Sequence, residues 1–119
     1  MKRTITKAAA IVAALTLSAS LTACNRDSEG GDKVLLALST QTNPFFVQLR
    51  DGAQAKADEL GVELEIQDAS DDAATQVNQL NNAATTGADV VIVNPVDSDA
   101  VTPAVTQLNN ANIPVVAVD

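Results

Sequence analysis

The stretch Ser-Thr-Gln-Thr-Asn-Pro-Phe-Phe, residues 39–46, decides how the chain is organised, because it marks a change from strand to helix. Residues 34–38 before it form an apolar run that is long enough for one buried strand. Asn43 followed by Pro44 is typical of a helix N-cap and the first helical residue. In open α/β sheets ligands bind beyond the carboxyl ends of the strands, so this loop is the first candidate for a functional site.

The same stretch contains the only two aromatic residues of the chain, Phe45 and Phe46. Phenylalanine is most often a core residue, which is the simplest explanation for such a pair. A helix turns by about 100° per residue, however, so two adjacent rings cannot both point into one core. The sequence therefore predicts that one of the two rings faces the loop.

Composition limits the possible functions. The chain has 119 residues, of which 46% are hydrophobic and few are aromatic, and this is typical of one small α/β domain. From residue 24 onward four basic residues stand against fifteen acidic ones, a net charge of −11 that repels nucleic acid and anionic membrane surfaces. With no histidine and one cysteine, zinc sites and histidine-based catalytic pairs are excluded.

The N-terminal residues have the layout of an export signal. Residues 1–7 are basic, residues 8–17 are apolar, and residues 18–23 are mostly small or polar, which predicts a secretory signal peptide over residues 1–23. The apolar run is about half of the ~20 residues that a membrane-spanning helix needs. Residues 24–33 are rich in glycine and charge, and we expect a flexible tether there.

Leu21-Thr22-Ala23-Cys24 resembles the lipobox of bacterial lipoproteins, in which the cysteine is acylated and becomes the new N-terminus. The resemblance implies that Cys24 is the site of lipid attachment and that the tether is lipidated. A free cysteine without such a role is the alternative.

From residue 34 onward the chain alternates between strand and helix patterns. Helices are predicted from Pro44 to about Leu60, with Gly61 as the stop, from a Ser70 cap to Gly87, and over residues 97–111. Residues 62–67 alternate strictly and are expected at a sheet edge. Residues 90–93 and 115–118 do not alternate, which predicts central parallel strands that are covered on both faces.

The helical periods also predict which residues are buried. The expected core-facing residues are Phe46, Leu49, Ala53, Ala57 and Leu60 in the first helix, Ala73, Val77, Leu80 and Ala84 in the second, and Val101, Ala104, Val105 and Leu108 in the third. Gly52 inside the first helix indicates close backbone packing. Pro103 leaves two options: the third helix begins near Pro103, or its first turn does not need the missing N–H.

The resulting order βαβαβαβ predicts an α/β fold with a doubly wound parallel sheet. Polar residues then line one rim, because Ser39, Asp68, Asn94 and Asp119 each lie at or just past the carboxyl end of a strand. Carboxylate and amide groups with an aromatic ring nearby suit a neutral polyol.

Several motifs together resemble the D-ribose-binding protein family, which supplies the binding component of bacterial sugar ABC importers within the type I periplasmic binding proteins. The motifs are Asn43-Pro44-Phe45-Phe46, Asp51-Gly52-Ala53-Gln54, Asn94-Pro95-Val96-Asp97-Ser98-Asp99-Ala100 and Ala111-Asn112-Ile113-Pro114-Val115. The resemblance covers residues 34–119 and implies part of the N-terminal lobe of a two-lobe protein, with the flavodoxin-like strand order 2-1-3-4-5.

The resemblance also implies roles for the rim residues. Phe45 and Phe46 would stack on the sugar, Asn43 and Asp119 would hydrogen-bond its hydroxyls, and Ser39 and Asn94 would line the pocket. The implied protein is a lipoprotein at the outer face of the cytoplasmic membrane that delivers a ribose-like monosaccharide to a permease and its ATPase subunit. We expect no enzymatic activity, cofactor, metal or nucleic-acid partner.

Two further functions remain open, together with a different ligand. The first is the effector domain of a LacI-type regulator, although such proteins carry a helix-turn-helix where this chain has its export signal. The second is a nucleotide-binding or enzymatic α/β domain, but residues 39–46 contain no glycine to cradle a phosphate. The ligand could also be another sugar or a furanose-like signal.

Overall fold

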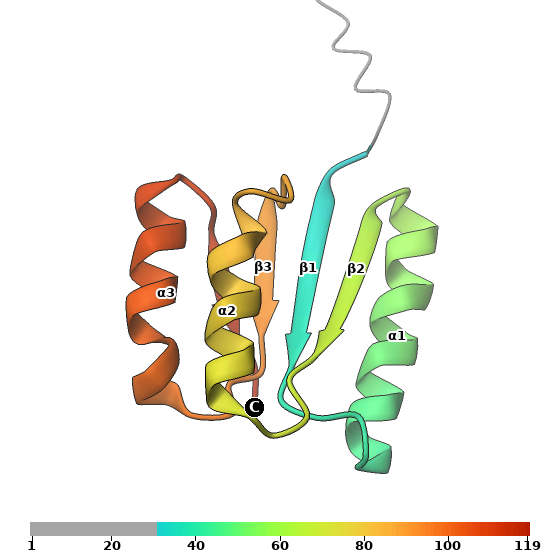
Figure 1. The fold of residues 1–119 in the computed structure, drawn as a ribbon. Helices are drawn as coiled ribbons and strands as arrows, with labels where there is room; N and C mark the ends of the chain where they lie inside the picture. The colour runs from blue at the N-terminus through green and yellow to red at the C-terminus, as the bar shows by residue number, and fades with distance from the viewer. Residues whose placement is uncertain (1–30) are drawn as a thin grey trace, which may run out of the picture.

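The computed structural model describes residues 31–119, and these form four strands and three helices in strict alternation (Figure 1). The elements are β1 (Lys33–Leu38), α1 (Pro44–Leu60), β2 (Glu63–Asp68), α2 (Ala73–Ala83), β3 (Val90–Val93), α3 (Ser98–Asn110) and β4 (Val115–Ala117). The signal peptide, Cys24 and most of the tether fall outside the described residues.

The four strands form one parallel sheet in the order β2-β1-β3-β4. In the register of β1, Val34 lies opposite Leu64 of β2 on one side and opposite Val90 of β3 on the other. Helices α2 and α3 lie side by side over one face, and α1 packs on the other (Figure 1). The prediction of a doubly wound parallel α/β sheet is therefore confirmed, and β2 lies at a sheet edge as expected.

The main core lies between the sheet and the pair α2 and α3. Alternate strand residues point toward these helices and meet their buried stripes, and the cluster comprises Leu35, Ala37, Leu80, Ala83, Ala88, Val91, Val93, Val101, Ala104, Leu108 and Ile113. The predicted stripe of α3 is confirmed by its buried residues. In α2 the stripe ends on Ala83, and Ala84, predicted to be buried, is exposed because the helix stops one residue before it.

The opposite face of the sheet is only partly covered. Leu36 and Leu38 of β1 are buried, but Val116 of β4 is 50% exposed and Leu60 of α1 is 63% exposed. A groove of about 230 Å³ runs along α1 and the sheet residues beside it. Among the described residues α1 is the only helix on this face, and β4 is the last strand of the sheet, so the predictions of a buried Leu60 and of β4 as a central strand covered on both faces are wrong.

Helix α1 begins and ends where the sequence predicts. The Asn43 side chain accepts a hydrogen bond from the Phe45 backbone N–H at 2.9 Å, and Pro44 is the first helical residue. Gly61 closes the helix with a left-handed φ of 69°. Gly52, predicted to pack closely, is exposed, and a methyl group in its place would have no heavy atom of the described residues within 4 Å.

The start of α2 differs from the prediction. Its N-cap is Asp72, whose carboxylate accepts a hydrogen bond from the Thr75 backbone N–H at 2.6 Å, while Ser70 lies in the preceding loop. Ser70 and Asp71 both have a left-handed φ, of 52° and 60°, so the loop needs two more residues before the helix can begin. The backbone hydrogen bond from Thr75, reinforced by the Thr75 side chain, lowers the pKa of Asp72.

Helix α3 resolves the question that Pro103 raised. The Asp97 side chain caps the helix by accepting a hydrogen bond from the Ala100 backbone N–H at 2.8 Å, so the helix starts before Pro103 and contains it. The backbone hydrogen bond that Pro103 cannot donate is absent from the second turn. Burial of the α3 stripe against α2 and the sheet offsets this loss.

The tether ends earlier than predicted. Lys33, assigned to the tether, is the first residue of β1, and the carbonyl of Asp32 accepts a hydrogen bond from the Glu63 backbone N–H at 3.0 Å. Sheet hydrogen bonding thus extends to the residue before the strand. Within residues 31–119, no helix has both the length and the hydropathy needed to cross a membrane.

Gly52 and Gly61 give a matched test of this backbone description, because a methyl group at either position enters open space. Gly52→Ala should raise the free energy of unfolding by about 1 kcal/mol, since alanine favours a helix interior. Gly61→Ala should lower it by about 1–2 kcal/mol, since alanine disfavours the left-handed conformation. Urea unfolding followed by circular dichroism measures both values, and shifts of the same sign would contradict the assignment.

Candidate functional site

The carboxyl edge of the sheet is organised by the side chain of Asn94, which follows β3. Its Oδ1 accepts hydrogen bonds from the Ser39 hydroxyl at 2.5 Å and from the Ser39 backbone N–H at 3.3 Å. Its Nδ2 donates to the carbonyl of Val118, after β4, at 3.1 Å. Asn94 is 4% exposed and Ser39 is 8% exposed. One buried amide therefore links the ends of β1, β3 and β4.

The backbone of Asn94 is held as firmly as its side chain. Its N–H donates to the carbonyl of Ala37 at 2.9 Å, and its carbonyl accepts from Nε2 of Gln76 at 2.9 Å. Gln76, in the first turn of α2, is fully buried and also accepts a hydrogen bond at Oε1 from the Val96 backbone N–H at 2.8 Å. Gln76 was not predicted as a site residue, although its spacing of four residues from Leu80 places it on the buried face of α2.

The loop between β1 and α1 is fixed by hydrogen bonds of its own. The Thr40 hydroxyl accepts from the Thr42 backbone N–H at 3.3 Å and lies 3.0 Å from the Thr42 hydroxyl. Gln41 Oε1 accepts from Nη1 of Arg50, in α1, at 2.9 Å. The carbonyl of Ser39 accepts from the Asp71 backbone N–H at 2.7 Å. These bonds define the path of the chain into α1.

Asn43, Phe45 and Phe46 lie at the end of this loop and in the first turn of α1. Asn43 is exposed, and its Oδ1 caps the helix while its Nδ2 has no protein partner among the described residues. Phe45 is 54% exposed, whereas Phe46 is half-buried. The two rings meet edge to face, with centroids 5.2 Å apart and an interplanar angle of 77°. This agrees with the expectation that the two rings do not share one core.

Asp119 is exposed and follows β4 on the same edge of the sheet. It borders a hollow of about 270 Å³ whose other lining residues are Pro95, Ser98, Ala117 and Val118. The hollow lies beside the first turn of α3, whose first residue is Ser98. An exposed carboxylate at a recess can accept hydrogen bonds from a ligand that enters it.

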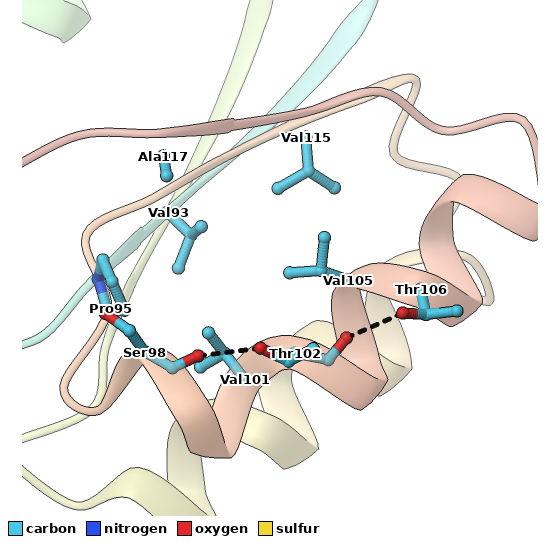
Figure 2. Close-up of a pocket in the computed structure, with 9 residues that line it drawn as sticks. All are labelled: Val93, Pro95, Ser98, Val101, Thr102, Val105, Thr106, Val115 and Ala117. Atoms are coloured by element: carbon cyan, nitrogen blue, oxygen red, sulfur yellow. Dashed lines mark hydrogen bonds between the residues drawn. The ribbon is translucent and has the colours of Figure 1, made fainter.

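A second groove of about 270 Å³ lies between α3 and β4 and has a different character (Figure 2). Valine side chains line it, among them Val93 of β3, Val105 of α3 and Val115 of β4. The hydroxyl groups of Thr102 and Thr106 donate to carbonyls of α3 itself, each at 3.0 Å. Its threonine donors are thus already used, so the groove is a poorer candidate for a polar ligand than the carboxyl rim.

The six predicted site residues all lie at the carboxyl edge of the sheet, but in two layers. Ser39 and Asn94 are buried beneath the rim and bonded to each other, whereas Asn43, Phe45 and Asp119 are exposed. Phe46 lies between these layers in exposure. The exposed layer offers an amide donor, a carboxylate acceptor and a ring face, a combination that suits a neutral polyhydroxylated ligand. In the part of the chain that the structure describes, no group of three or more acidic or cysteine side chains is arranged to hold a metal ion.

Comparison with known proteins gives the same fold and a consistent set of relatives. Residues 34–119 match the family model of the periplasmic binding protein domain. The ribose import binding protein RbsB of Escherichia coli K12 is 41% identical over 113 residues, which cover 95% of this chain and 37% of the relative. The Haemophilus influenzae protein of the same name is 39% identical over 119 residues, or 100% of this chain and 38% of the relative.

Among solved structures, the similar proteins are also solute-binding proteins of ABC transporters. An ABC transporter solute-binding protein from Mycobacterium smegmatis with bound glycerol is 40% identical with a TM-score of 0.71, over 76% of this chain and 31% of that one. A periplasmic solute-binding protein from Actinobacillus succinogenes with bound D-allose is 30% identical with a TM-score of 0.71, over 74% and 32%. This chain thus spans under two fifths of the length of the curated relatives described above.

Two substitutions test the Asn94 link. Asn94→Asp keeps an acceptor for Ser39 but removes the donor to Val118 and buries a charge, so we expect a loss of several kcal/mol in unfolding free energy. Ser39→Ala removes one hydroxyl donor and should cost about 1 kcal/mol. Urea unfolding measures both values. Equal and negligible losses would show that the buried link contributes nothing to the fold.

Proposed function

The chain belongs to the periplasmic binding protein domain family, and on that premise we propose that it is part of a solute-binding lipoprotein which captures a ribose-like monosaccharide for an ABC importer. The permease and ATPase subunit of that importer would be its partners, and the protein would act by binding and not by catalysis. The observation that carries the proposal is the exposed amide of Asn43, carboxylate of Asp119 and ring of Phe45 on the carboxyl rim of the sheet. The chain that carries this rim is similar to ribose import binding proteins.

Each rim residue has a role in this proposal. Asn43 donates from Nδ2 to a sugar hydroxyl, and Asp119 accepts from hydroxyls on the β4 side. The Phe45 ring covers the C–H face of the sugar, and Phe46 adds contact while it supports Phe45 edge to face. Ser39 and Asn94 form the base of the pocket and keep the strand ends in place.

This chain covers under two fifths of the length of the Escherichia coli and Haemophilus influenzae relatives, so it would supply only part of a binding site of their kind. We propose that residues 34–119 supply one wall of the site and that a second lobe closes over the sugar. Enclosure between two lobes buries more of the ligand and shields its directed hydrogen bonds from water. The rim residues described above would then contact one side of the ligand.

Ribose is favoured over other polyols by the Escherichia coli and Haemophilus influenzae relatives, which are identical to this chain at about two fifths of the matched positions and bear the name ribose import binding protein. Related structures hold other neutral polyols, including D-allose and myo-inositol. All of these ligands present hydroxyl groups without a net charge. A neutral polyol also suits residues 24–119, whose net charge is −11, because an uncharged ligand meets no electrostatic repulsion.

A hybrid protein tests the site, with residues 34–119 replacing the matching segment of the Escherichia coli relative. Titration calorimetry should show D-ribose binding by the hybrid. Asn43→Ala and Phe45→Ala should each weaken it by about 1–3 kcal/mol, because hydroxyls are left unpaired or ring contact is lost.

Leu60→Ala is the matched control, since Leu60 is an exposed apolar residue at the opposite end of the same helix. Its ribose affinity should equal that of the parent hybrid. Parent-like affinity in both Asn43→Ala and Phe45→Ala would show that this loop is not the site. D-allose, myo-inositol and a nucleoside in the same titration identify the preferred ligand, and residues 24–119 alone should bind ribose only weakly.

The lipid anchor is a separate proposal, supported by the residues around Cys24. We expect the mature protein to begin at Cys24 and to carry diacylglycerol, whose two acyl chains give firm membrane attachment at about 0.8 kcal/mol per buried CH₂. Mass spectrometry of protein from a bacterial host measures the modification, with Cys24→Ser as the control. An unacylated mature protein with another N-terminus would contradict the proposal.

A further inference from the structure

Gln76 connects α2 to the loop between β3 and α3 by two hydrogen bonds. Its Nε2 donates to the carbonyl of Asn94 at 2.9 Å, and its Oε1 accepts from the backbone N–H of Val96 at 2.8 Å. The residue is completely buried, so neither end of the amide can exchange its partner for water. Both ends of one rigid group thus hold two residues of the same loop.

The loop that Gln76 holds contains the organising residue of the rim. The side chain of Asn94 reaches Ser39 and Val118, at the ends of β1 and β4. A displacement of the Asn94 backbone would therefore move or break the links to both neighbouring strand ends. Helix α2 is itself anchored, because Leu80 and Ala83 pack in the core. The position of the rim is in this way tied to the core through one glutamine.

We propose that Gln76 is a positioning residue for the sugar site. By holding the backbone of Asn94, it fixes the position of the β1–α1 loop relative to the end of β4. The loop carries Asn43 and Phe45, and Asp119 follows β4. The inference rests on the proposed function, because it assigns Gln76 to that same site. Gln76 itself does not contact the sugar, since it is fully buried beneath the rim.

Gln79, three residues further along α2, provides a matched comparison. Its Nε2 donates to the carbonyl of Asp68 at 2.9 Å, so it holds the end of β2, while its Oε1 is buried and has no protein partner among the described residues. Asp68 is not among the proposed sugar contacts. Gln79→Leu should therefore affect stability without the loss of affinity that we expect from a change at Gln76.

Gln76→Glu distinguishes positioning from packing. The carboxylate that this substitution introduces can, when ionised, accept from Val96 but repels the Asn94 carbonyl, whereas its protonated form can donate to that carbonyl as glutamine does. Burial raises the pKa of a carboxyl group, so protonation falls within an accessible pH range. Gln76→Leu removes both hydrogen bonds at every pH. Asp72 and Asp97, the caps of α2 and α3, are present in every variant and in the parent, so the parent supplies the reference for any pH effect that does not arise at position 76.

The first measurement needs no sugar. In NMR spectra of the chain itself, the amide signals of Ser39 and Val96 should shift in both Gln76 variants at pH 8. In Gln76→Glu they should return toward the parent positions at pH 5, and in Gln76→Leu they should not. Signals that stay at the parent positions in both variants would overturn the inference, because Gln76 would then not hold the loop.

The second measurement is D-ribose affinity in the hybrid protein. At pH 8 both Gln76 variants should bind about tenfold or more weakly than the parent, and Gln79→Leu should bind within about twofold of it. At pH 5 only Gln76→Glu should recover. Parent affinity in both Gln76 variants overturns the inference and leaves the proposed function standing. A parent hybrid that binds no sugar overturns the proposed function, and with it the role assigned to Gln76.

Discussion

The Asn94 side chain is the interaction on which the carboxyl edge of the sheet depends. Parallel strands share no hairpins, so their ends are joined only by ladder hydrogen bonds and by whatever links the loops beyond them. A buried amide is suited to this task, because it can accept from Ser39 and donate to Val118 at the same time. A carboxylate or a hydroxyl in its place would lack either the donor or the reach.

The sequence was a good guide to the fold where local chemistry determines the outcome. Asn43 before Pro44 and the left-handed Gly61 set the limits of α1, and the apolar runs located the strands along the chain. The predicted start of α2, with Ser70 as the N-cap, was wrong because serine and aspartate are equally good N-cap residues. Which of them caps the helix depends on the left-handed residues of the preceding loop, and no sequence signal marks those.

The sequence predicted where the candidate site residues lie in the fold, but not which of them contact one another. Residues that follow strands were correctly placed on one rim, yet the sequence could not show that Ser39 and Asn94 bind each other beneath it. Gln76 was overlooked because a glutamine in an amphipathic helix is usually a surface residue. The prediction that Leu60 is buried was wrong for a different reason. Periodicity identifies the apolar face of α1 but does not show how much of that face another element covers.

The choice of asparagine at position 43 follows from both functions that this residue would serve. Aspartate, serine and threonine can also cap a helix through a side-chain oxygen, so capping alone does not require an amide. Asn43 uses Oδ1 for the cap and leaves Nδ2 without a protein partner among the described residues, and aspartate could not supply such an N–H donor at neutral pH. The cap bond also restricts the side-chain torsions, so a donor held in this way loses little conformational entropy when a ligand binds. Helix initiation and ligand recognition can thus share one side chain, because the two ends of an amide are chemically different.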